Sequence, residues 1–221
     1  MPSDLSRGQD RRAEIAAVAA RLIADEGADW TAARRQAAHI VLGADTDRRG
    51  LIPSDEEIEA AVREHLRTFA ATTHPLLLAA LRRAAVAVME RLAAFEPYLT
   101  GAVLNGTATE HSDLDLELFV DSVKDVEVAL LDAGLDYQAL APTTGSGVVP
   151  QEILIFTLPV PRDAGLPKSV RKLGVKLAIF EAKALRVAPR ARSSAPDLHP
   201  VAAAGRANLA MLKQLISETS S

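Results

Sequence analysis

Apolar side chains recur at helical spacing through the first 72 residues of the chain. Over residues 11–26 they fall three and four positions apart, and the same spacing predicts a second helix over residues 30–42. Ser54, followed three positions later by Glu57, is the capping-box pattern that opens a third helix. The pattern therefore predicts a mostly helical N-terminal region over residues 1–72.

Beyond residue 72 the hydrophobic spacing alternates between helical and strand-like. Proline and glycine punctuate the changes, which is typical of connections between short elements. The predicted helices cover residues 75–95, 123–133 and 201–216, and the predicted strands cover 98–101, 113–120, 137–140, 152–160 and 175–180. This order predicts an α+β core over residues 73–221, a sheet flanked by helices.

The strand predicted at residues 113–120 alternates carboxylates with leucines. Because successive side chains of a strand point to opposite faces, Asp113, Asp115 and Glu117 share one face and three leucines share the other. Same-face neighbours lie about 7 Å apart, close enough for Asp113 and Asp115 to share two divalent cations about 3.5–4 Å apart. The same alternation is typical of a surface strand with one wet face. The residues upstream distinguish the two interpretations.

Two glycines and a serine precede the acidic strand. Gly101 ends the first strand, Gly106 lies in the following turn, and Ser112 stands directly before Asp113. Residues 98–120 thereby resemble the nucleotidyltransferase superfamily, which includes DNA polymerase β and the small bacterial minimal nucleotidyltransferases. In that family a strand ends in Gly-Ser, a turn follows, and the next strand begins Ser-Asp-hydrophobic-Asp.

The resemblance implies a nucleotidyltransferase-like mixed sheet and a Mg²⁺-dependent reaction. An NMP would move from an NTP, with ATP expected, to an acceptor that the sequence does not identify. Two Mg²⁺ ions would activate the acceptor oxygen and neutralise the phosphates, with Asp113 and Asp115 as ligands. The family takes a third carboxylate from a neighbouring strand. Glu152 is the first candidate for that catalytic role, while Glu117 and Glu181 remain open.

The resemblance also implies which residues contact the nucleotide. Ala102 stands where the family has a serine whose hydroxyl contacts phosphate, so Thr107 and the backbone N–H groups of the turn are the remaining donors. Cations of the loop at residues 161–174 are candidates for the triphosphate. The expected nucleotide-binding residues are Gly101, Ala102, Gly106, Thr107, Ser112, Lys168 and Arg171.

Two other functional classes stay open. Ala102 favours a degenerate nucleotidyltransferase-fold protein that serves as a binding or antitoxin-like module. The two helices predicted over residues 11–42 superficially resemble the DNA-binding part of tetracycline-repressor-like proteins, which leaves a helical DNA-binding regulator as the third class. No recognition helix or signature of that family follows them.

Composition bears on the binding partners and the cellular compartment of the protein but does not identify a reaction. The net charge is −4 and the pI about 5.8, which disfavours general nucleic-acid binding because such domains are usually basic. The chain has no cysteine, so it offers no disulfide or thiolate chemistry. No signal-peptide pattern and no apolar run of the roughly 18 residues that a bilayer requires is present. We therefore expect a cytoplasmic protein with no membrane partner.

Overall fold

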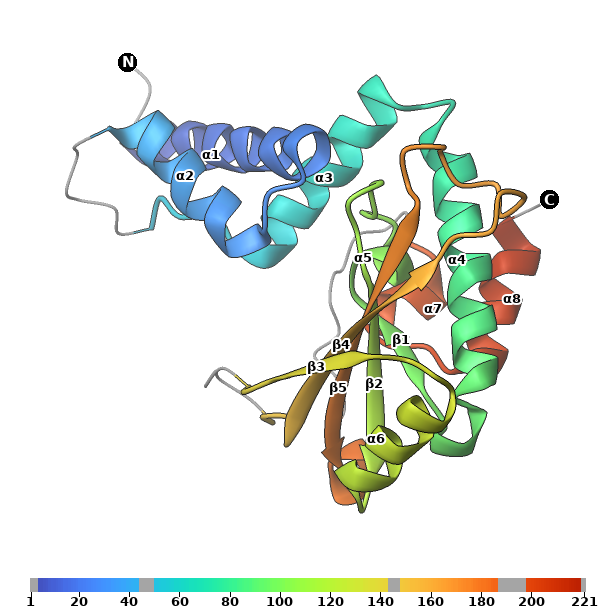
Figure 1. Cartoon of the computed structure of the whole chain (residues 1–221). Coiled ribbons are helices and arrows are strands. Elements are labelled where there is room, and N and C mark those ends of the chain that lie inside the picture. Colours follow the sequence, from blue (N-terminus) through green and yellow to red (C-terminus); the bar gives the residue numbers. More distant parts are fainter. Residues whose placement is uncertain (1–3, 44–49, 143–147, 187–197, 220–221) are drawn as a thin grey trace. The chain divides into compact units, whose positions relative to one another are not determined.

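The computed structural model describes residues 4–43, 50–142, 148–186 and 198–219. The chain divides into two compact units, Met1–Pro75 and Leu76–Ser221 (Figure 1). Each unit has its own hydrophobic core. The first is helical and the second is a mixed α+β unit, so the α+β prediction is confirmed.

The described residues of the first unit form three helices. They are α1 (Asp4–Glu26), α2 (Trp30–Leu42) and α3 (Asp55–Phe69). Ile15, Ile58 and Val62 are fully buried between α1 and α3. The predicted capping box opens α3, because the Ser54 hydroxyl accepts from the Glu57 N–H and the Glu57 carboxylate accepts from the Ser54 N–H. The first helix begins at residue 4, well before the predicted residue 11.

The second unit holds the strands. Its helical elements are α4 (His74–Arg91), η1 (Ala93–Phe95), α5 (Gly101–Asn105), α6 (Val123–Asp132), η2 (Ala182–Arg186), α7 (Pro200–Ala203) and α8 (Leu209–Thr219). Its strands are β1 (Tyr98–Thr100), β2 (Leu114–Val120), β3 (Tyr137–Leu140), β4 (Glu152–Pro159) and β5 (Lys172–Glu181). Among the described residues, no helix is long and apolar enough to cross a membrane.

The five strands form one mixed sheet in the order β1-β2-β5-β4-β3 (Figure 1). β2 and β5 are parallel, while the other neighbouring pairs are antiparallel. The parallel pair places Asp115 opposite Lys176, and β5 in turn places Lys176 opposite Ile155 of β4. This register decides which side chains surround the predicted aspartates.

One face of the sheet is the core of the second unit. The leucines of β2, at 114, 116 and 118, are at most 1% exposed, as the alternation predicted. They share the core with Leu177 of β5 and Phe156 of β4, and with residues of α4, α6 and α8. Each buried leucine contributes roughly 1.5–3 kcal/mol to folding. The opposite face carries the polar positions of the same strands.

Three segments differ from the sequence-based prediction. The expected turn after β1 contains a short helix, α5, which Gly101 starts at a φ of +67°. The predicted closing helix is broken into α7 and α8, because Gly205 has a φ of +79° and Ala207 pairs with Leu99 at the sheet edge. β5 begins at Lys172, inside the predicted loop, because its pairing with β4 extends that far.

Candidate functional site

The two aspartates lie at the N-terminal end of β2. Asp113 immediately precedes the strand and Asp115 is its second residue, on the face opposite the buried leucines. Thr100, at the end of β1, donates its hydroxyl to the Asp115 carbonyl oxygen, 3.3 Å away. The predicted pair of carboxylates is thus carried by a central strand of the sheet.

Each carboxylate lies against a glycine of a neighbouring segment. A Cβ on Gly101 would come within 2.5 Å of Asp115 Oδ2, and a Cβ on Gly174 would overlap the Asp113 carboxylate. Gly101 is also required by its positive φ, whereas Gly174 is required only by the space. Backbone therefore approaches both carboxylates from β5 and from the start of α5.

Lys176 is the cation beside the pair. Its Nζ lies 3.7 Å from Asp115 Oδ1, and both side chains are partly exposed. Removal of water raises the pKa of the Asp113 carboxyl above its usual range, and the positive charge of Lys176 opposes that rise. The cluster of Asp113, Asp115 and Lys176, named the β2–β5 cluster below, carries a formal charge of −1 at neutral pH.

Glu152 is not part of this cluster, contrary to its predicted role as the third carboxylate. It pairs with Ile179, which is three positions along β5 from Lys176, or about 10 Å. Because Ile179 and Lys176 are an odd number of positions apart, they lie on opposite faces of the sheet. The Glu152 side chain therefore lies on the buried face, with Ile179, and not on the face of the aspartates. Glu152 instead acts on Tyr137, whose pKa it helps to raise after the larger effects of the hydrogen bond to Glu127 and of burial.

The other two candidates also lie apart from the cluster. Glu117 shares the Asp115 face but lies one pleat further along, where Arg206 Nη1 is 3.9 Å from its Oε2. Glu181 ends β5 and forms an ion pair with Lys183. Within the described part of the chain, no group of three or more His, Cys, Asp or Glu side chains is arranged to hold a metal ion.

The segment after α5 is held by internal hydrogen bonds. The Asn105 side-chain oxygen accepts from both the Thr107 N–H, at 3.0 Å, and the Thr107 hydroxyl, at 2.7 Å. Thr107 is 1% exposed, so its hydroxyl is buried against Asn105 and is not presented at the surface. The Ser112 hydroxyl accepts from the Thr109 N–H at 2.9 Å and thereby shapes the approach to Asp113.

Arg82 anchors the same segment from α4. Its guanidinium is buried and donates to the carbonyl oxygens of Val103, at 3.2 Å, and Leu104, at 3.1 Å. Burial lowers the pKa of Arg82 to about 10. Gly106 completes the end of α5 at a φ of +83°. The predicted phosphate-contacting segment is therefore a short helical turn held by hydrogen bonds, and Gly101 at its start lies against Asp115.

An open hollow of about 400 Å³ lies between the loop before β2 and the start of β5. It is lined by Glu110, His111, Ser169 and Arg171, among others, and Ser169 donates its hydroxyl to the Glu110 carboxylate at 2.7 Å. Arg171 is thus one of the cations that line this hollow, so the predicted basic loop contributes to it only in part. Lys168 is exposed and is not among the residues that line this hollow.

Sequence reasoning missed Lys176, Gly174 and Arg206. Arg206 lies over the rings of Tyr98, 5.5 Å away, and Phe119, 5.1 Å away, and so fixes the polar face beyond the cluster. A hydrophobic pattern assigns Lys176 to the polar face of its strand but cannot give its partner. Only the parallel pairing of β2 with β5 does that.

Comparisons of the chain with protein-family models, with curated proteins and with solved structures find no match. The resemblance to nucleotidyltransferases therefore rests on the sequence of residues 98–120 alone.

Proposed function

We propose that the unit of residues 76–221 is a nucleotidyltransferase-like module that binds the phosphates of a nucleotide with Mg²⁺ and does not transfer the nucleotide. The observation that carries the proposal is Lys176, which faces Asp115 from the neighbouring strand with its ammonium 3.7 Å from the carboxylate. The resemblance implies a third carboxylate from a neighbouring strand, whereas the residue of β5 that lies opposite Asp115 is a lysine.

Charge distinguishes binding from transfer at this site. Three carboxylates carry −3 and can hold two divalent cations, as two-metal transfer requires. The β2–β5 cluster carries −1, so one Mg²⁺ already makes it positive and attractive to a triphosphate. A second Mg²⁺ would have to bind beside both an ammonium and the first ion, which mutual repulsion opposes. One Mg²⁺, Lys176 and Arg171 together suit a bound polyphosphate.

A second candidate function is active nucleotidyl transfer. It is favoured by the clearance that Gly101 and Gly174 give to Asp115 and Asp113. Glycines at both positions leave space for backbone and ligand close to the carboxylates, which a wet surface strand does not require. In this alternative Lys176 would stabilise charge on the α-phosphate in place of one metal ion.

The DNA-binding alternative has less support. Residues 1–75 contain ten arginines and no lysine, against thirteen aspartates and glutamates, so the helical unit is itself acidic. Duplex DNA is bound chiefly through Lys and Arg contacts to phosphate.

The test is calorimetric titration of the full chain with ATP, in Mg²⁺ and in EDTA, followed by incubation with α-labelled ATP. We expect Mg²⁺-dependent binding and no covalently transferred label. Asp115→Asn should weaken the Mg²⁺-dependent binding about tenfold or more, since it removes a charged ligand. Lys124→Met, on the exposed surface of α6, is the matched control for loss of a lysine in Lys176→Met.

The outcomes separate the two candidates. Labelled product formed by the parent and lost in Asp115→Asn would establish transfer and overturn the binding-only proposal. Equal ATP affinity in Mg²⁺ and EDTA, or no ATP binding at all, would overturn both. Loss of binding in Lys176→Met but not in Lys124→Met would support a direct role for Lys176.

A further inference from the structure

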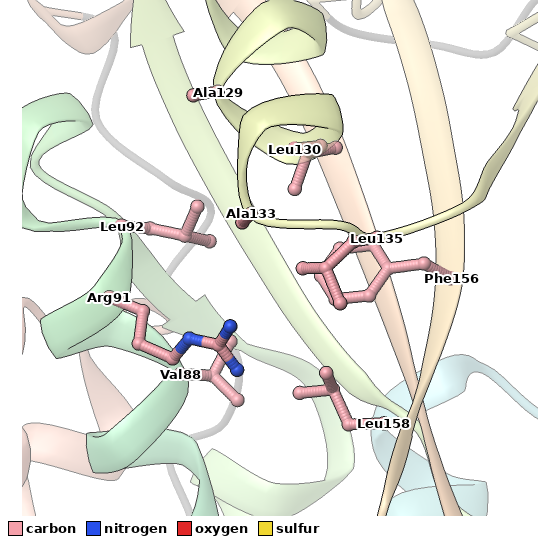
Figure 2. Close-up of a pocket in the computed structure, with 9 residues that line it drawn as sticks. All are labelled: Val88, Arg91, Leu92, Ala129, Leu130, Ala133, Leu135, Phe156 and Leu158. Carbon is pink, nitrogen blue, oxygen red and sulfur yellow. The ribbon is translucent and has the colours of Figure 1, made fainter.

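A second hollow lies on the other face of the sheet, within the core side of the same unit. It has a volume of about 60 Å³ and is bounded by α4, α6 and β4 (Figure 2). Leu92, Leu130, Phe156 and Leu158 form much of its wall. Phe156 and Leu158 belong to the buried face of β4, whereas Asp115 belongs to the opposite face of the sheet, so the hollow is separate from the β2–β5 cluster.

Small side chains on α6 leave this space open. Ala129 and Ala133 lie one helical turn apart and both line the hollow. Residues four apart lie on the same side of a helix. A larger side chain at either position would fill the gap between α6 and α4, so the hollow is a property of these two alanines.

Arg91 is the one charged residue among the nine that line the hollow. Figure 2 shows its side chain extending from the end of α4 with the guanidinium directed toward the space between Leu92 and Leu158. No described residue forms an ion pair or hydrogen bond with it. The same unit's Arg206, by contrast, pairs with Glu117.

A cation at the rim of an apolar hollow suits a ligand with one anionic end and one apolar end. The guanidinium offers parallel N–H donors that match a carboxylate, and the wall offers only apolar contact. Binding pockets for small molecules combine these elements, an apolar lining and a few polar groups that fix orientation. The apolar part must be short, because a volume of about 60 Å³ has room for only a few water-sized groups.

We propose that this hollow binds a short aliphatic monocarboxylate, of the size of butanoate or pentanoate, with its carboxylate on Arg91 and its tail against Leu130 and Phe156. Arg91 fixes the orientation and the alkyl wall provides most of the affinity. Each buried methylene should strengthen binding about fourfold until the hollow is full. For so small a ligand we expect a dissociation constant of roughly millimolar order.

The test is an NMR titration of the full chain with acetate, butanoate, pentanoate and 1-pentanol at constant ionic strength. We expect shifts of residues around the hollow, with affinity rising from acetate to pentanoate and pentanoate binding more tightly than pentanol. Arg91→Met should reduce pentanoate affinity about tenfold and leave pentanol unchanged. Arg83→Met, an exposed arginine on the same helix, is the matched control.

Ala129→Leu provides a second variant, because it fills the hollow without touching Arg91. It should block pentanoate and pentanol alike. If that variant does not fold, the comparison of Arg91→Met with Arg83→Met and of acid with alcohol still decides. Equal affinity for pentanoate and pentanol, equal effects of the two arginine variants, or shifts confined to Lys176 and its neighbours would each overturn the proposal.

Discussion

The two faces of the sheet differ in how strictly they depend on the identity of the cross-strand neighbour. On the buried face, Leu114, Leu116 and Leu118 meet other apolar side chains, and any partner of suitable volume would satisfy them. On the open face, Asp115 lies opposite Lys176, with the ammonium 3.7 Å from the carboxylate, and the proposed nucleotide binding depends on the charge of that lysine. Packing on one face therefore tolerates many cross-strand partners, while the site on the other face depends on a single register.

The largest expected effect is on the buried face. Leu116→Ala should reduce the free energy of unfolding by about 3 kcal/mol, through lost burial and an added cavity. Lys176→Met, on the open face of the adjacent strand, should change it by about 0.5 kcal/mol or less, because the ion pair is partly exposed. Urea denaturation measures both. A loss above 2 kcal/mol in Lys176→Met would contradict this prediction and show that the ion pair on the open face contributes to stability as much as a buried side chain does.

The next prediction restores the carboxylate that the resemblance implies. Lys176→Asp changes the cluster from −1 to −3, so affinity for Mg²⁺ should rise about tenfold or more. Without Mg²⁺ the three carboxylates repel one another, and the melting temperature should fall by about 2–4 °C. Calorimetry with Mg²⁺ alone and melting with and without the ion measure the two effects. Lys124→Asp controls for the change of net charge.

If Lys176→Asp leaves Mg²⁺ affinity unchanged, Lys176 does not face the metal-binding position. The β2–β5 cluster would then be a surface ion pair, and the binding proposal would lose its main support.

A smaller effect is expected from the glycine behind Asp113. Gly174→Ala places a methyl group where the Asp113 carboxylate lies, and that flexible side chain can rotate away. Stability should change by about 1 kcal/mol or less, while Mg²⁺-dependent ATP binding weakens several-fold. Gly8→Ala in α1, whose methyl group would lie in ordinary contact with Leu51 at 3.7 Å, is the matched control. Unchanged ATP binding in Gly174→Ala would show that the Asp113 orientation is irrelevant to the ligand.

Sequence reasoning succeeded where the information was local. The capping box at Ser54, the helix over residues 30–42 and the inward leucines of β2 depend on neighbours within a few positions, and the structure confirms them. The break between α7 and α8 was missed because the Leu99–Ala207 pairing that accompanies it joins residues far apart in sequence.

Sequence spacing predicts the two aspartates of the candidate site but not the side chains around them. The motif of residues 101–115 located both aspartates, since their spacing along one strand is local. The position of Glu152 at the start of a strand predicts it as the third carboxylate, but strand order and register place it away from the aspartates and place Lys176 opposite Asp115. The sequence also does not show that the Thr107 hydroxyl donates to Asn105, because that hydrogen bond depends on the conformation at the end of α5.

The smallest predicted effect concerns the protonation of Asp113. Its pKa is raised in the folded protein because nearby protein removes water from the charged form. Between the unfolded and folded pKa values the native state therefore binds more protons, so this group's stabilising contribution is present in acid and is lost as the pH rises through the folded pKa. Asp113→Asn removes the ionisation and should raise the melting temperature by about 1–2 °C at pH 7, with the gain vanishing near pH 3. Saturating Mg²⁺ should reverse the order of the two melting temperatures at pH 7, because only the parent has both carboxylate ligands.

Scanning calorimetry of the parent and of Asp113→Asn between pH 3 and pH 7 measures the difference in melting temperature. A gain that persists unchanged at pH 3 would show that shape rather than charge separates the two side chains at this end of β2.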